Sequence, residues 1–323
     1  MTARDPLRDI IGTCAAQIGA IATPVLSPLI IGGLIVGLSV GEIEAGTLIT
    51  IELLLIGITS MLLAPMMARI SHHKLAITGA LILILGHVLS SLSTELTELY
   101  LWRALAAFGG GCLVATVNAA IAQARSPTLL YGLAWAAAYT VTAILAVVIT
   151  ETNDLISFDI VFRYLAIAIA LILPLLWFVP RHGGESIPIA IPAGSIGIGC
   201  LLLLGIMLIG ISMMAYYAFL GQLALLIGAN AAQTGWIIAI AQIAGIIGGL
   251  SAAPLSKRLG VIAALTVTSG LHALIICVAI WTDNINVLGV TAFCEAVLFI
   301  IMIPLMLTLA ANIDKQGRWA AAA

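Results

Sequence analysis

The sequence predicts an all-α, polytopic membrane protein. Of its 323 residues, 63% are hydrophobic and only 8% are charged, and the mean hydropathy is +1.23. A soluble domain of this size carries about 25% charged residues. Apolar runs of roughly the 20 residues that one bilayer crossing requires follow one another along the whole chain. Most of the chain is therefore expected to be surrounded by the lipid bilayer.

Ten apolar runs, separated by short polar breaks, are the expected transmembrane helices. In chain order they cover residues 10–37, 46–67, 75–92, 98–123, 128–149, 159–179, 195–219, 234–253, 261–281 and 286–311. None shows the alternation of a membrane β-strand. The first is longer than the apolar core of a cleaved signal peptide. Each run is therefore read as one helical span.

The charges of the loops predict the orientation, because Lys and Arg stay on the cytoplasmic side. With a cytoplasmic N-terminus, the inner segments hold ten of the twelve basic residues, namely Arg4, Arg8, Arg69, Lys74, Arg125, Arg181, Lys257, Arg258, Lys315 and Arg318. The outer loops hold acidic residues and no Lys or Arg. Tryptophans gather near the span ends, except Trp135, which falls about two turns inside its span. We expect a multi-pass protein of the plasma (inner) membrane.

The composition also argues against several partners and ligands. Twelve basic and fourteen acidic residues give a net charge of −2, so no positive field is available to hold nucleic acid. The five cysteines all fall inside apolar runs without paired spacing, which predicts neither a metal site nor disulfides. His72, His73 and Lys74 are expected to form a solvated turn. We expect no metal, no cofactor and a monomer.

An internal repeat divides the chain. Residues 32–70 align without a gap on residues 221–259, and both copies contain Ala-Pro-x-x-x-Arg, ending at Arg69 and at Arg258. The offset spans six helices, an even number, so both copies have the same orientation. The predicted units are an N-terminal six-helix half (1–180), a cytoplasmic linker (181–194) and a C-terminal half (195–323) with four helices.

Three motifs resemble one transporter family. The loop at 64–73 reads A-P-M-M-A-R-I-S-H-H, similar to G-x-L-a-D-r-x-G-r-k with Ala68 in the acidic position; Leu99-x-x-x-Arg103 precedes a run of glycines; and residues 314–318 look like a later cytoplasmic loop. With the parallel repeat, the chain resembles the major facilitator superfamily over its whole length. The resemblance implies twelve helices in two parallel six-helix repeats and cytoplasmic gating loops at Arg69 and Arg258. We expect about ten of those twelve, either by C-terminal truncation or in a genuine ten-helix transporter.

Ionisable side chains inside the spans are costly and are therefore candidates for function. Glu52, His87 and Arg103 share one depth, which predicts a charge cluster whose Arg could attract an anionic substrate or tune the carboxylate. Alternatively, Arg103 extends to the outer headgroups and Glu52 only pairs with it. Glu295 and His272 fall near mid-membrane, where Glu295 could carry a coupling proton. The resemblance places the span of Glu295 at a central cavity.

Uncharged polar side chains complete the candidate site. The residues expected to face a substrate cavity are Gln17, Asn118, Tyr139, Tyr216 and Gln242. They could equally bond from helix to helix, which is a common use of polar side chains in membranes.

The predicted function is secondary active transport of a small organic solute by alternating access, coupled to protons as in a symporter. The alternative is a non-transporting sensor or an intramembrane enzyme on the same scaffold. Enzymatic activity is not expected, because the G-x-S-x-G match at 37–41 ends a membrane span rather than joining a strand to a helix. The sequence contains no P-loop for ATP.

Overall fold

The computed structural model describes residues 7–67, 69–152, 157–181, 193–229 and 231–313, and these residues form helices joined by short turns and connections. The α-helices are α1 (Leu7–Val25), α2 (Ser27–Leu38), α3 (Glu42–Leu63), α4 (His72–Leu92), α5 (Leu96–Ala122), α6 (Pro127–Thr152), α7 (Phe158–Ile172), α8 (Ala193–Leu226), α9 (Ala231–Leu259), α10 (Val261–Trp281) and α11 (Ile285–Ile313). Two 3-10 segments, η1 (Ala64–Met66) and η2 (Leu173–Phe178), extend α3 and α7. The all-α fold class is confirmed.

The helices match the ten expected spans closely but not one for one. Among the described residues, eight helices are long and apolar enough to cross a membrane, and α1 with α2 adds a ninth as a pair bent by 47°. The expected span 234–253 forms helix α9 but is not among these nine. The count of ten is therefore approximate.

The bend between α1 and α2 has a local cause. Pro28 stands in the first turn of α2, and proline lacks the N–H that would continue the helical ladder. The Leu29 N–H donates to the Leu26 carbonyl at 3.0 Å, which tightens the chain at the break. The single run predicted at 10–37 is thus two helices with a kink.

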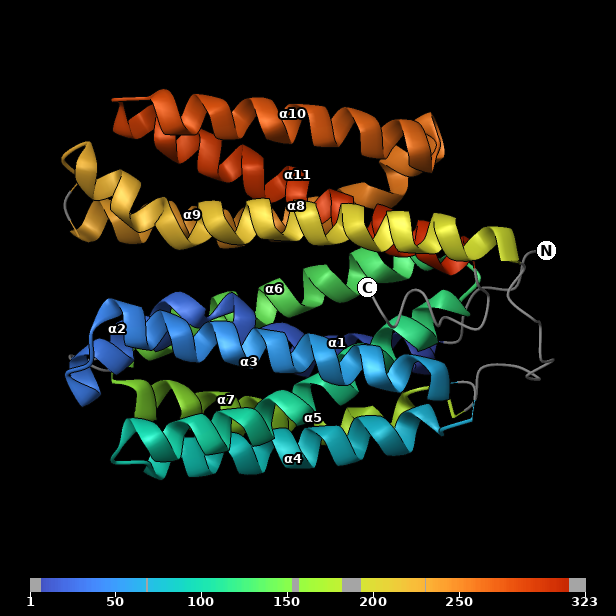
Figure 1. Cartoon of the computed structure of the whole chain (residues 1–323), viewed down its shortest axis with the longest axis horizontal. Coiled ribbons are helices and arrows are strands. Elements are labelled where there is room, and N and C mark those ends of the chain that lie inside the picture. The colour runs from blue at the N-terminus through green and yellow to red at the C-terminus, as the bar shows by residue number, and fades with distance from the viewer. Residues whose placement is uncertain (1–6, 68, 153–156, 182–192, 230, 314–323) are drawn as a thin grey trace.

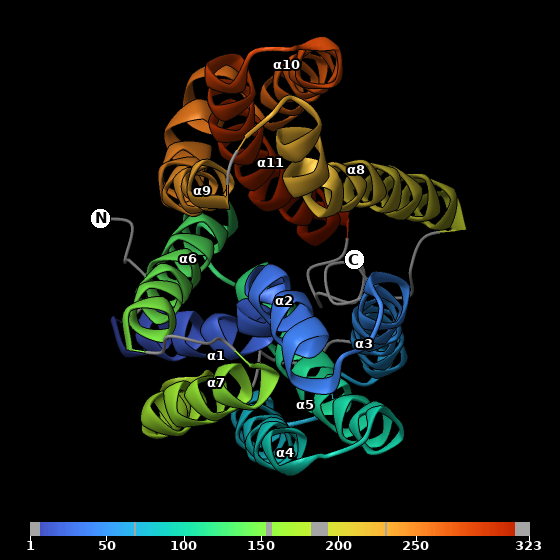
Figure 2. The ribbon, with the colours of Figure 1, turned by 90° about the vertical axis from the view of Figure 1, so that its left-hand side faces the viewer.

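The helices form two groups, which we call the first group (α1–α7) and the second group (α8–α11). They run along the long axis of the molecule (Figure 1), and an end view shows the second group on one side and the first on the other. In Figure 2, α6 of the first group adjoins α9 of the second. The halves 1–180 and 195–323 stay a prediction. Most of the predicted linker, and the motif at 314–318, lie outside the described residues.

Helices α6 and α9 approach closely because each has a glycine at the contact. A Cβ added at Gly132 would lie 2.2 Å from the carbonyl oxygen of Gly249, and one added at Gly249 would lie 2.7 Å from the carbonyl oxygen of Gly132. Only residues without a side chain allow two helix backbones this near to each other.

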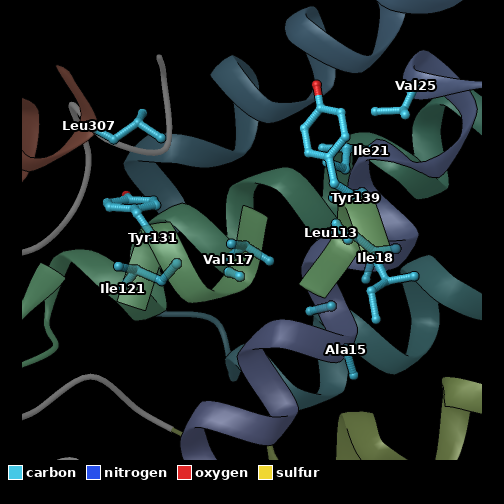
Figure 3. Close-up of a cluster of buried hydrophobic side chains, with 14 of the residues drawn as sticks. Ala15, Ile18, Ile21, Val25, Leu113, Val117, Ile121, Tyr131, Tyr139 and Leu307 are labelled. Carbon is cyan, nitrogen blue, oxygen red and sulfur yellow. The ribbon is translucent and has the colours of Figure 1, made fainter. Parts of the chain in front are cut away.

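Three large clusters and four smaller ones contain most of the buried apolar side chains of the described residues. The largest joins the two groups and contains Leu113 and Tyr131 of the first group and Leu307 of the second (Figure 3). A second cluster, around Leu34 and Phe158, contains only residues of the first group. A third, with Leu220, Ala279 and Leu288, contains only residues of the second. The two groups are therefore packed together over part of their length only.

Candidate functional site

A cavity of about 290 Å³ lies between the two helix groups. Helices α1, α3, α5 and α6 of the first group and α8, α9 and α11 of the second contribute to its wall. Most lining residues are apolar. The polar or partly polar side chains are Gln17, Asn118, Trp135, Tyr139, Tyr217, Gln242 and Glu295. Few polar groups in an apolar wall are typical of a site for a small organic molecule.

Four of the five expected cavity residues line this space, namely Gln17, Asn118, Tyr139 and Gln242. Tyr216 does not. Its side chain packs in the apolar cluster with Leu220 and Ile237, whereas its neighbour Tyr217 lines the cavity. Successive residues of an α-helix point about 100° apart, since 3.6 residues make a turn. An error of one residue in the predicted rotation of the helix therefore places Tyr216 at the cavity instead of Tyr217.

Gln242 ties the two groups together at the cavity. Its Nε2 donates to the Val25 carbonyl at 3.3 Å, and both residues are buried. Val25 is the last residue of α1, next to the kink. The side chain thus belongs both to the cavity wall and to a bond between α9 and α1.

Glu295 supplies the one acidic or basic side chain in the described cavity wall. It is 2% exposed, and its Oε1 lies 3.4 Å from Nδ1 of His272 on α10. This separation is too long for a well-formed hydrogen bond. His272 is itself buried and does not line the cavity, so it approaches the carboxylate from the side facing α10.

Glu52, His87 and Arg103 are in contact, but away from the cavity wall. Arg103 donates from Nε to Glu52 Oε2 at 2.9 Å, from Nη2 to Glu52 Oε1, and from Nη1 to His87 Nδ1 at 2.9 Å. All three side chains are at most 2% exposed. The guanidinium carbon lies 4.5 Å from the ring centroid of Phe162. Two aligned donors to one carboxylate make a bidentate pair.

This geometry assigns the protonation of His87 and limits the role of Arg103. Because an arginine nitrogen can only donate, His87 Nδ1 accepts, and a neutral imidazole carries its proton on Nε2. Arg103 faces Glu52 and His87 and is absent from the cavity wall, so it is not placed to attract an anion there. Nor does its side chain extend to the outer headgroups, since it is 1% exposed.

The expectation of a solvated turn at His72 and His73 is wrong. Both histidines are in the first turn of α4 and are buried. His72 Nε2 lies 3.0 Å from the Met67 carbonyl, and the His73 ring packs edge-on against Trp177 at 5.7 Å. The side chain of Trp177, from η2, covers this turn. No group of three potential metal ligands occurs among the residues that the structure describes.

A family model described as the Major Facilitator Superfamily matches residues 10–322. The chain belongs to this superfamily. No curated protein matches the chain.

Solved structures of superfamily transporters have the same fold. The transporter FucP in the outward conformation is 16% identical, with 98% of this chain and 87% of that one covered and a TM-score of 0.76. The proton:xylose symporter XylE, bound to 6-bromo-6-deoxy-D-glucose, is 15% identical over 98% and 84%, with a TM-score of 0.65. The human organic anion transporter MFSD10 is 12% identical over 98% and 91%, with a TM-score of 0.67.

The two arginines that the superfamily resemblance placed in gating loops lie at helix ends. Arg69 follows η1 in the connection to α4, where its N–H donates to the Met66 carbonyl at 2.8 Å. Arg258 stands in the last turn of α9. Both are exposed and neither lines the cavity. Ala68, in the position where the superfamily carries an acid, lies outside the described residues.

Of the four aromatic residues in the described cavity wall, sequence reasoning predicted Tyr139 and missed Trp135, Tyr217 and Phe299. Trp135 stacks on Tyr139 with ring centroids 6.1 Å apart and an interplanar angle of 30°, and both line the cavity together with Tyr217 and Phe299. A signal was present for Trp135, because it lies deep in its span, away from the interfacial belts. Phe299 carried none, since it stands in a wholly apolar run.

Proposed function

We propose that this superfamily member is a proton-coupled secondary transporter of a small organic solute. The observation that carries the proposal is the position of Glu295: a buried carboxylate in the wall of a cavity between two helix groups. Ionisable residues within membrane spans face cavities and form proton relays in many transporters. His272, at 3.4 Å, is the neighbouring group through which a proton could reach or leave the carboxylate.

The two-group construction supports alternating access. We propose that the halves 1–180 and 195–323, joined by the linker 181–194, rock about the cavity so that it opens to each side in turn. The charges of the loops support a cytoplasmic N-terminus in the plasma (inner) membrane. The protein is proposed to act as a monomer, because each chain carries both halves of the site.

The structural neighbours support a small organic solute. FucP is described as the E. coli fucose:proton symporter, XylE as a proton:xylose symporter and MFSD10 as an organic anion transporter. Coupling at one carboxylate can take two forms. A neutral solute would cross the membrane together with the proton, as in a symporter. A solute that displaces the proton from the carboxylate would instead be exchanged for the proton across the membrane.

Proton movement in vesicles tests the coupling role. The purified chain would be reconstituted into liposomes containing a pH-sensitive dye, and L-fucose, D-xylose or phenyltrimethylammonium would be added outside. We expect proton movement with at least one probe and a loss of at least about tenfold in Glu295→Gln, because the amide cannot carry the proton. Glu42→Gln, at the exposed start of α3, is the matched control.

An unchanged proton flux in Glu295→Gln would contradict the coupling role. The rival functions predict other results: a probe that binds without crossing the vesicle membrane favours a sensor, and a chemically altered probe favours an intramembrane enzyme. Membership of a transporter superfamily argues against enzymatic activity.

A further inference from the structure

Four aromatic rings and one carboxylate share the cavity wall. Trp135 and Tyr139 come from α6, Tyr217 from α8, and Phe299 from α11, one turn from Glu295. Faces of aromatic rings attract organic cations through the ring quadrupole, and ammonium ligands are commonly bound in such surroundings. The carboxylate adds a full negative charge when it is ionised.

No basic side chain opposes a cation in this wall. The sequence has no Lys or Arg between Arg181 and Lys257, nor between Arg258 and Lys315, so the cavity-lining parts of α8, α9 and α11 cannot supply one. In the first group, Arg103 is bound to Glu52. An anion in the cavity would therefore face Glu295 without a compensating charge, and in a low-dielectric site such repulsion is strong.

Helices α5, α6, α8, α9 and α10 pack against α11, which carries Glu295. Helix α10 contributes His272 at 3.4 Å. Helices α6 and α8 contribute Tyr139 and Tyr216, which are both within electrostatic reach of Glu295, and Tyr217 lines the same cavity. The described wall of α9 and α5 is uncharged, with Gln242 and Asn118 as its polar members. His272 can gain a positive charge, but it lies outside the cavity wall.

We infer that the transported solute is a small organic ammonium ion, whose cationic group lies among Trp135, Tyr139 and Phe299 and pairs with Glu295. The inference rests on the proposed function and narrows its substrate class. One carboxylate cannot hold a proton and pair with an ammonium ion at the same time. The solute and the proton therefore exclude each other and are exchanged across the membrane rather than carried together.

Three probes with one phenyl ring each test the charge preference. Binding of phenyltrimethylammonium, its neutral isostere tert-butylbenzene and the anion benzenesulfonate would be measured by calorimetry on the full chain in detergent at several pH values. We expect phenyltrimethylammonium to bind at least about tenfold more tightly than either of the others. At pH values below those at which Glu295 ionises, the affinity for phenyltrimethylammonium should fall by about tenfold for each unit by which the pH is lowered. Binding should then release one proton from the protein. Glu295→Gln should weaken the preference to what the aromatic rings alone supply and abolish the pH dependence, whereas Glu42→Gln should change neither.

The variant His272→Gln shows whether Glu295 or His272 causes the pH dependence of binding. If Glu295 is the competing site, the pH dependence persists in this variant. Tighter binding of benzenesulfonate, binding of the cation that is independent of pH, or a full cation preference in a folded Glu295→Gln protein would overturn the inference. Its failure is distinguishable from failure of the proposed function, because proton-coupled flux of a neutral sugar that depends on Glu295 would leave the transport function standing and exclude only the ammonium class.

Discussion

At the scale of single residues, the pair of Glu52 and Arg103 illustrates how a charge can be retained inside a membrane bundle. Both side chains are almost fully buried, and each satisfies the other through a bidentate contact, with His87 accepting a third bond. A lone charge at this depth would cost several kcal/mol. Within the network each charge therefore compensates the other, and none of the three side chains is among the lining residues of the cavity.

Removing one partner of this pair should destabilise the fold. Breaking a buried ion pair costs about 3–5 kcal/mol in soluble proteins, because the remaining charge is left without compensation. We expect Arg103→Met and Glu52→Met each to lower the midpoint of thermal unfolding in detergent, and the double variant to be more stable than the sum of the two effects predicts. Arg163→Met, which breaks the half-exposed pair with Asp159, should have little effect. Additive losses in the double variant would contradict the argument.

The sequence allowed some of these residues to be predicted and others not. Depth along a span can be counted, so the meeting of Glu52, His87 and Arg103 could be anticipated. The rotation of a helix about its own axis could not be predicted, because α8 is apolar on all sides and has no polar stripe that would show which side faces the cavity. This is why the sequence predicts Tyr216 in the cavity wall, where the structure has Tyr217. The burial of His73 depends on Trp177, more than one hundred positions away.

At the scale of elements, the close contact between α6 and α9 depends on the absence of a Cβ atom at one residue of each helix. Lengths of apolar runs predicted both helices, but no run length indicates that Gly132 and Gly249 would face each other. Their backbones touch because both lack Cβ. The length of the apolar run does not predict the kink between α1 and α2 either, because the run continues through the kink without a polar break.

An added methyl group at this contact should force the helices apart. In Gly132→Ala the new Cβ would meet the Gly249 carbonyl oxygen at 2.2 Å, an overlap that only a backbone shift can relieve; overpacking of this kind costs about 1–3 kcal/mol. We expect reduced proton-coupled flux and a lower unfolding temperature. Gly57→Ala in α3, where nothing lies within 4 Å of the added atom, should leave both unchanged. Equal behaviour of the two variants would show that the close approach is unimportant.

At the scale of the whole molecule, the apolar core joins the groups at one end and leaves them separate at the other. The shared cluster includes Tyr131 and Leu307, and near it the hydroxyls of Thr128 on α6 and Thr308 on α11 are 2.9 Å apart. The clusters around Phe158 and around Leu288 each belong to one group. A molecule that opens alternately must break the first set of contacts and form new ones between the others.

Locking the joined end should stop transport without removing the site. With the five native cysteines replaced, Thr128→Cys and Thr308→Cys would be combined and joined by oxidation or a short bifunctional reagent. We expect vesicle flux to be lost on cross-linking and restored by reductant, while phenyltrimethylammonium still binds. Each single cysteine variant is the control. Full flux in a completely cross-linked protein would mean that this end does not open during transport.

The kink at Pro28 has a consequence for the cavity beside it, whose wall includes Val25 at the end of α1. In an unbroken helix the Leu29 N–H would occupy the Val25 carbonyl, but here it donates to Leu26, and Gln242 donates to Val25 instead. Replacing Pro28 by a residue that straightens the helix would return that carbonyl to its own ladder. The Gln242 amide would then be free to address the solute. A substitution outside the wall would thus change solute selectivity by releasing a donor rather than by altering a lining residue.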